Sequence, residues 1–283
     1  MTLGAPAKLA VFCAGLVLVG GVAALAGAAN RGPAKRSATA DDAMHMQASD
    51  PERSNGLASS VAGYSLVTDR TVLPLGRSVP LRLRILNSSG KPVANFDLDG
   101  GVRLHLIVVR RDLTGYQHLH PRVERGGSWS VPVTLAAPGA YRAYADFELD
   151  GVKTVLGTDL FVAGTFVPST ASPPSPHARV DGYDVELVHG ALRAGEESEL
   201  SFRVRRGGRP VTRFDEYVGR RGHLVALHEG DLAYTHVHPA PGAPAGVIRF
   251  DAELAAAGSY RLFLQFKTGG VVHTVPFATR VAR

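Results

Sequence analysis

Six of the eleven histidines recur at equivalent positions in two halves of the chain, and imidazoles in such an arrangement are candidate metal ligands. The first set is His105, His118 and His120, and the second set is His223, His236 and His238. In both sets the second histidine follows the first by thirteen positions, and the third follows the second by two. Because the two halves have diverged at most other positions, the shared spacing is informative in itself.

A β-hairpin would bring the first set together. His118 and His120 are two residues apart, so on a strand their side chains point to the same face. If residues 103–120 form a hairpin centred near residues 112–113, His105 lies directly opposite His120. Opposed Cβ atoms are about 4.5–5.5 Å apart and diagonal neighbours about 7–8 Å apart, so the three imidazoles would converge. A register shift of one residue would move His105 to the other face.

The metal that such a site would hold follows from its donors. Cys13 is the one cysteine, so the ligands would be imidazoles, with oxygen or water completing the coordination. Imidazole suits Cu(II) and Zn(II). Ligating rings must be neutral, so affinity is expected to fall as the pH drops through about 6.5. A structural interpretation is equally open: imidazoles can bond to loop carbonyls and pack by their faces, and the proline after each His-x-His ends a strand.

Other residues with chemical potential give weaker signals. Met44-His45-Met46 combines two thioethers with an imidazole, a set that suits Cu(I). Four histidines have no counterpart in the other half and are expected at the surface or at strand edges: His177, His189, His228 and His273.

The sequence predicts no enzyme. It contains no G-x-S-x-G, H-E-x-x-H or P-loop motif. Carboxylates are available, but nothing in the sequence pairs them as an acid and a base: Asp112, Asp146, Glu148 and Asp231. The net charge of +6 is dispersed without a long basic run, so nucleic-acid binding is not expected either.

A tandem duplication positions the histidines. HLIVVRRDLTGYQHLHP at 105–121 matches HLVALHEGDLAYTHVHP at 223–239, and GAYRAYADFELDG at 139–151 matches GSYRLFLQFKTGG at 258–270. Further blocks keep the same offset of 118 or 119 residues. Within each copy, short alternating segments are separated by turn residues, which is typical of antiparallel sandwiches.

The predicted fold is therefore all-β, with two tandem immunoglobulin-like or cupredoxin-like antiparallel β-sandwiches and no helix after residue 60. The repeats are assigned to residues 61–164 and 181–283. A polar stretch, 30–60, and a Pro/Ser-rich stretch, 165–180, are interpreted as linkers.

An apolar segment precedes the repeats. Leu9–Ala29 contains no charged residue and is long enough to span a bilayer as a helix, and it ends in Ala26-Gly27-Ala28, as a cleavable signal peptide does. Residues 1–29 are thus expected to be a signal peptide or an N-terminal membrane anchor. Either role places the repeats outside the cytoplasm, in the cell envelope or secreted.

The repeated histidine block and the PGAYRAYADF-like strand that follows it resemble those of uncharacterised actinobacterial exported proteins with tandem β-sandwiches. In outline these are similar to periplasmic β-sandwich proteins that handle copper and other heavy metals. The resemblance implies a non-enzymatic envelope protein that binds copper or zinc through the repeated histidines. The alternative is an adhesion-like or scaffold protein that binds a protein or glycan, with structural histidines.

Overall fold

The computed structural model describes residues 54–169, 173–235 and 237–283, and of His238 the backbone alone. The predicted N-terminal span, residues 1–29, and the tripeptide Met44-His45-Met46 lie outside these residues. Within the described ranges, no helix is long and apolar enough to cross a membrane.

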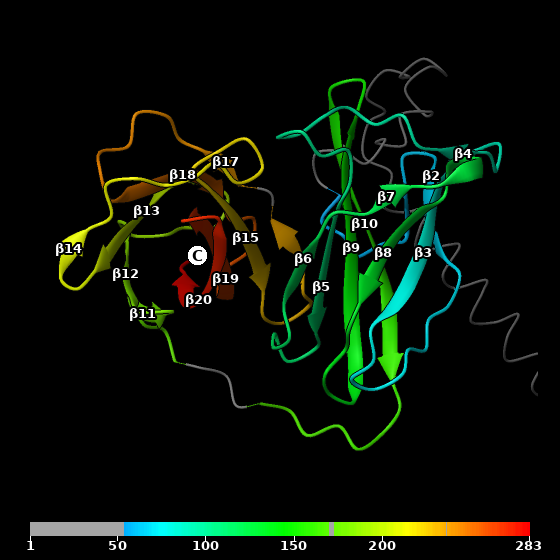
Figure 1. Ribbon diagram of the computed structural model, residues 1–283, viewed down its shortest axis with the longest axis horizontal. Coiled ribbons are helices and arrows are strands. Elements are labelled where there is room, and N and C mark those ends of the chain that lie inside the picture. Colours follow the sequence, from blue (N-terminus) through cyan, green and yellow to red (C-terminus); the bar gives the residue numbers. More distant parts are fainter. Residues whose placement is uncertain (1–53, 170–172, 236) are drawn as a thin grey trace, which may run out of the picture. The chain divides into compact units, whose positions relative to one another are not determined.

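The first repeat is built from two antiparallel sheets (Figure 1). One has the order β1-β2-β3-β8-β7, with β4 paired to β3, and the other has the order β10-β9-β5-β6. The strands are β1 Ser60–Val61, β2 Tyr64–Thr68, β3 Val79–Leu86, β4 Pro92–Val93, β5 His105–Arg110, β6 Gln117–Leu119, β7 Arg122–Val123, β8 Trp129–Val133, β9 Gly139–Leu149 and β10 Val152–Val162. A short 3-10 turn, Arg125–Gly127, precedes β8.

The second repeat has the same strand order, β11-β12-β13-β18-β17 with β14 on β13, and β16-β15-β19-β20. Its strands are β11 His177–Val180, β12 Tyr183–Val188, β13 Glu197–Arg206, β14 Arg209–Pro210, β15 Gly222–His228, β16 Tyr234–Thr235, β17 His238–Pro239, β18 Val247–Glu253, β19 Gly258–Thr268 and β20 Val271–Val281. β11 lies inside the stretch that the sequence analysis assigns to the second linker. The predicted pair of tandem β-sandwiches is confirmed.

Each sandwich is of the immunoglobulin-like type. β2, β3, β8 and β7 occupy the places of strands A, B, E and D, and β10, β9, β5 and β6 those of G, F, C and C′. Each repeat also has a tyrosine corner, in which a tyrosine near the start of strand F bonds back to the preceding turn. Tyr141 Oη donates to the Ala137 carbonyl at 2.8 Å, and Tyr260 Oη donates to the Ala256 carbonyl at 3.0 Å.

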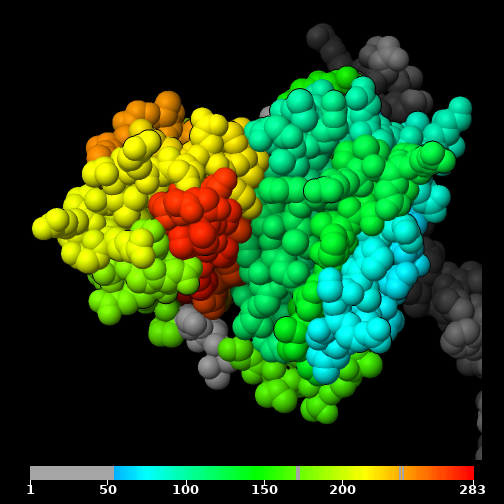
Figure 2. Space-filling model, in the orientation of Figure 1, coloured from blue at the N-terminus to red at the C-terminus, as the bar shows by residue number. Residues whose placement is uncertain are grey.

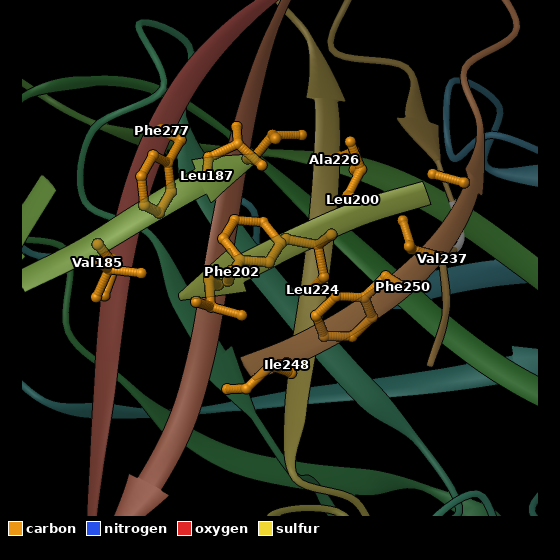
Figure 3. Close-up of a cluster of buried hydrophobic side chains, with 14 of the residues drawn as sticks. Val185, Leu187, Leu200, Phe202, Leu224, Ala226, Val237, Ile248, Phe250 and Phe277 are labelled. Carbon is orange, nitrogen blue, oxygen red and sulfur yellow. The ribbon is translucent and has the colours of Figure 1, made fainter. Parts of the chain in front are cut away.

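The two repeats have separate apolar cores. In β3, buried residues alternate with exposed ones, as expected for a strand with one face on a core. Phe96 stacks on Trp129 in the first core, with ring centroids 5.5 Å apart. Figure 3 shows the second core, where aromatic and aliphatic side chains from both sheets interdigitate.

A third apolar cluster joins the two repeats. β5 is buried at every position, because Leu106 and Val108 face the core of their own sandwich while Ile107 and Val109 contact the second repeat. The partner residues include Val225, Leu227, Leu232, Tyr234 and Phe263. In Figure 2, residues of the second repeat, yellow to red, lie against green residues of the first. The outer faces of β5 and β6 are thus covered.

Candidate metal-binding site

The β5–β6 hairpin has the register that the histidine spacing predicts. Leu106 pairs with Leu119 and Ile107 with His118, so continuing the register places His105 opposite His120. The three histidines therefore share one face of the hairpin, which is the face turned toward the second repeat. A shift of one residue would have sent His105 into the core of the first sandwich.

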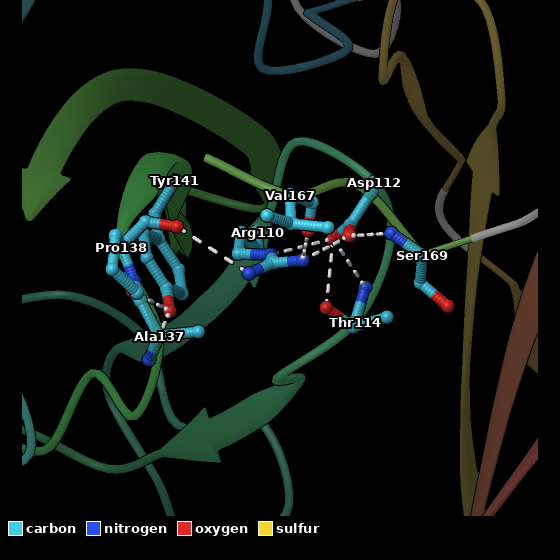
Figure 4. A network of polar contacts seen from close by, with 8 residues as sticks. All are labelled: Arg110, Asp112, Thr114, Ala137, Pro138, Tyr141, Val167 and Ser169. Carbon is cyan, nitrogen blue, oxygen red and sulfur yellow. Dashed lines mark hydrogen bonds and ion pairs between the residues drawn. The ribbon is translucent and has the colours of Figure 1, made fainter. Parts of the chain in front are cut away.

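A buried ion pair fixes the turn of this hairpin (Figure 4). Asp112 accepts bonds from the Arg110 guanidinium, from the Thr114 hydroxyl at 2.7 Å and from the Ser169 backbone N–H at 2.8 Å. The Arg110 hydrogen bond lowers the pKa of Asp112 well below its usual value, so the carboxylate stays ionised. Arg110 also donates to the Val167 carbonyl at 2.9 Å, tying the turn to the segment that follows the first repeat.

The imidazoles of the first set converge. Candidate ligand atoms of His105, His118 and His120 all lie within 4.8 Å of one another. His105 Nδ1 and His118 Nε2 are 2.9 Å apart. Two nitrogens at about 2.0–2.1 Å from one ion are separated by about 2.9–3.4 Å, so this pair already has the spacing of two ligands. Within the described ranges, His120 Nε2 is buried and has no hydrogen-bond partner.

The second repeat orients His118. Its Nδ1 lies 2.7 Å from Gln265 Oε1 in β19 and 3.3 Å from the Tyr217 hydroxyl. Since an amide oxygen can only accept, Nδ1 carries the proton and Nε2 presents a lone pair. Metal-bound histidines commonly donate their second ring nitrogen to an oxygen in this way. Gln265 is thus placed to fix both the tautomer and the ring orientation of His118.

The site favours neutral imidazoles. Burial, followed by repulsion from His105 and His120, lowers the pKa of His118 to about 3. Burial and repulsion from His105 lower the pKa of His120 to about 4. Both rings are therefore neutral at pH 7, which is the protonation state that metal binding requires of an imidazole.

The residues of the second histidine set are placed differently. His223 stacks on rings of the first set, with centroids 5.8 Å from that of His105 and 4.4 Å from that of His118. His238 lies in β17, where its backbone pairs with Asp251, and its side chain is outside the described atoms. His236 lies outside the described residues.

Two polar residues were not assigned to this site from the sequence, where Asp146 stands only among the available carboxylates and Gln265 is not named. Asp146 in β9 pairs in register with His105, and Gln265 in β19 pairs with His223. Both are buried, and Asp146 accepts a hydrogen bond from Tyr234 of the second repeat at 2.9 Å. An alignment of the two repeats indicates that these residues are unusual. Each is a polar residue within an otherwise apolar strand segment, YADF or FLQF, and both occupy the same position of their repeat.

Of the four unmatched histidines, expected at the surface or at strand edges, His273 lies in the edge strand β20 but is not at the surface. Its side chain is buried, because the rings of Tyr183 and Phe266 pack on it with centroids 4.7 and 5.1 Å away. His228 is half-buried against Tyr260. His177 and His189 are exposed as predicted.

A family model described as "Domain of unknown function (DUF8832)" matches residues 59–164 and 178–283. The chain belongs to the DUF8832 family. The two matches coincide with the two sandwiches, so a DUF8832 domain is one immunoglobulin-like unit and this protein has two in tandem. A comparison with curated proteins gives no match.

Solved structures show weak likeness to this tandem DUF8832 chain. The Escherichia coli adhesin FdeC matches with 15% identity and a TM-score of 0.28, covering 79% of this chain and 65% of the adhesin chain. A Salmonella alpha-2-macroglobulin mutant matches with 14% identity and a TM-score of 0.28, over 76% of this chain and 14% of its own. Domains 5–6 of the S-layer protein SbsC match with 10% identity and a TM-score of 0.23, over 77% and 96%. No functional inference follows from these likenesses.

Proposed function

We propose that this protein binds a Cu(II) or Zn(II) ion through His105, His118 and His120, and that it does so outside the cytoplasm. The observation that carries the proposal is the convergence of three imidazoles whose candidate ligand atoms lie within 4.8 Å of one another. All-imidazole donor sets suit these two ions, and three protein ligands leave a position for water or another oxygen ligand.

The surroundings of the trio support ion binding over a purely structural role. His118 Nε2 presents its lone pair because Gln265 holds the proton on Nδ1, 2.7 Å away. In the structure this lone pair meets His105 Nδ1 at 2.9 Å, so the two nitrogens share one hydrogen. An ion would take the place of that hydrogen, and the single ring proton of neutral His105 would move from Nδ1 to Nε2. Neither nitrogen has to move far to become a ligand.

The proposed role is retention of the ion without catalysis. The internal repetition extends the same ligand role to His223, His236 and His238, which gives a second ion per chain. The apolar segment Leu9–Ala29 supports export, with the protein anchored in the cell envelope or secreted.

A second candidate is an adhesion-like or scaffold module that binds a protein or glycan, with structural histidines. The observation that favours it is an exposed apolar pair on the first repeat. Val72 and Phe161 are bridge partners and are 62% and 44% exposed. Adjacent exposed apolar side chains are typical of protein contact surfaces when they form part of a larger patch.

The proposal is tested by titrating fragment 54–283 with metal. Binding is measured by calorimetry and by Cu(II) electron paramagnetic resonance. Nitrogen hyperfine structure from at least two imidazoles and saturable binding of one or two ions are the expected results. Absence of saturable binding of both Cu(II) and Zn(II) at pH 7 would leave the structural interpretation of the histidines and the second candidate.

A further inference from the structure

A second cluster of polar side chains lies in the second repeat, apart from the histidine trio. His273 in β20 places Nδ1 2.7 Å from Asp181 Oδ2 and Nε2 3.1 Å from Thr268 Oγ1. The Tyr183 hydroxyl lies 2.7 Å from the same Thr268 oxygen. A hydroxyl bonded to an imidazole that is itself oriented by a carboxylate is the arrangement of an activated nucleophile.

The donor and the acceptor of each hydrogen bond in this cluster follow from the groups at the two ends of the series of bonds. The Asp181 carboxylate accepts, so neutral His273 carries its proton on Nδ1 and must accept at Nε2. Thr268 therefore donates its hydroxyl hydrogen to His273, and its oxygen accepts from Tyr183. Arg206 Nη1 donates in turn to the Tyr183 oxygen at 3.3 Å. The threonine proton thus points at a base, and one oxygen lone pair remains for attack.

The cluster opens into a surface pocket with a basic lining. Thr268 and His273 line it together with Arg206, Arg209 and Arg213. The Arg206 guanidinium lies 4.9 Å from the centroid of the Tyr183 ring and is held in place by it. Guanidinium groups pair with carboxylates in bidentate fashion, so the pocket suits a small molecule that carries a carboxylate.

We propose that this pocket is an acyl-transfer site that hydrolyses small carboxylate-bearing esters through Thr268. Oγ1 forms a bond to the ester carbonyl carbon while its proton passes to His273 Nε2. The C–O bond to the alcohol then breaks, and the alcohol leaves with the proton from His273.

Water completes the cycle. A water molecule adds to the acyl-threonine carbonyl and gives a proton to His273 Nε2, which returns it to Oγ1 as the Thr268–acyl bond breaks. The products are the carboxylic acid and the free enzyme. The net reaction is ester plus water to acid plus alcohol.

The chain contains a matched comparison for this cluster. Thr279 Oγ1 and His189 Nε2 are 3.2 Å apart, close to the separation in the first pair. The other nitrogen of His189 faces the carbonyl of Gly190 at 2.6 Å instead of a carboxylate. The pair therefore lacks the ionised group that would stabilise an imidazolium, so it serves as an internal control.

The test uses the purified full chain with a chelator present, so that metal at the histidine trio does not contribute. The substrates are the mono(4-nitrophenyl) ester of glutaric acid and neutral 4-nitrophenyl acetate. We expect preferred turnover of the anionic ester, and intact-mass and peptide mapping should locate the acyl group on Thr268 after an acid quench. Thr268→Val and His273→Gln should each lower the rate at least about 100-fold, whereas Thr279→Val and His189→Gln should leave it unchanged.

Two further readouts separate chemistry from a structural role. Thr268→Ser keeps the hydroxyl and should retain turnover, and Asp181→Asn should lower kcat while leaving KM unchanged. Circular dichroism confirms that each variant folds. Equal rates for the wild-type chain and Thr268→Val, or an acyl label found only on lysines or on other residues, would overturn the proposal.

Discussion

The imidazoles of His105 and His223, which hold the same position in the two repeats, stack on each other between the sandwiches with centroids 5.8 Å apart and planes 11° from parallel. A contact between equivalent residues is expected only where two copies meet about a local two-fold axis. The histidine pair therefore marks the axis that relates the two repeats. The first histidine trio lies beside it.

Other contacts between the repeats also occur in pairs that are related by exchanging the first repeat with the second. Tyr116 of the first repeat stacks on Phe263 of the second, with centroids 4.1 Å apart. The equivalent residues with the repeats exchanged, Tyr234 and Tyr144, pack at 5.5 Å. The interface is thus self-complementary, as in a symmetric dimer. Duplication of a domain that paired with itself accounts for it.

The Tyr116–Phe263 stack is predicted to couple the stability of the two repeats. Phe263 is buried, so Phe263→Ala should lower the free energy of unfolding by about 3–5 kcal/mol. A double-mutant cycle with Tyr116→Ala, measured by urea denaturation, should give a coupling energy of about 0.5–1.5 kcal/mol. Phe161→Ala, at a position 44% exposed, is the control and should cost less. Strict additivity of the Tyr116 and Phe263 substitutions would contradict a contact between them.

Gln265 is predicted to control metal affinity without being a ligand. Gln265→Leu removes the acceptor for His118 Nδ1–H, so the ring loses its fixed tautomer and orientation. Loss of such a partner typically weakens metal binding about 10–100-fold. Gln265→Glu retains an acceptor oxygen and should bind at least as tightly as the wild-type chain. Calorimetric titration of the three proteins measures the effect, and equal affinities would show that Gln265 does not orient the site.

Removal of a ligand is predicted to abolish binding without unfolding the protein. His120 is half-buried at the end of the hairpin, so His120→Ala should eliminate Zn(II) binding and leave the melting temperature of the metal-free protein nearly unchanged. His177→Ala, at an exposed position in β11, is the matched control and should bind normally. If His120 has a structural role at the end of the hairpin instead, the opposite outcome is expected. His120→Ala then lowers the melting temperature, and metal has no effect on either protein.

The hairpin could be predicted from the sequence because its determinants are local. A side-chain period of two and a turn centred on residues 112–113 fix which of His105, His118 and His120 share a face. The spacing of the repeats likewise predicted the duplicated sandwich, since matched blocks at one offset imply matched strands.

The second repeat's contribution to the site could not be predicted in this way. Gln265 reaches His118 across 147 residues of sequence, through an interface whose geometry no local pattern specifies. A signal was present: the runs LIVV in β5 and LVAL in β15 are apolar without alternation, which indicates a strand covered on both faces. The partner that covers the second face is set by the complementarity of the two surfaces, which periodicity does not encode.

The Arg110–Asp112 pair is predicted to make the stability of the first repeat depend on acid pH. The folded-state pKa of Asp112 lies below the ordinary value of 3.8, mainly because Arg110 bonds to the ionised form. The unfolded chain therefore binds the proton first, so the stabilisation is complete above about pH 4 and is lost as the pH falls toward the folded pKa.

Asp112→Asn should lower the free energy of unfolding at pH 7 by about 1.5–3 kcal/mol, the range for a charge-assisted hydrogen bond. The same substitution should flatten the decline of the free energy of unfolding between about pH 4 and 2. Asp159→Asn is the control, because Asp159 is 56% exposed in its ion pair with Arg142 and should contribute about 1 kcal/mol or less. Urea denaturation across this pH range measures both effects, and parallel pH profiles for wild type and Asp112→Asn would show that the buried pair does not stabilise the turn that aligns the histidines.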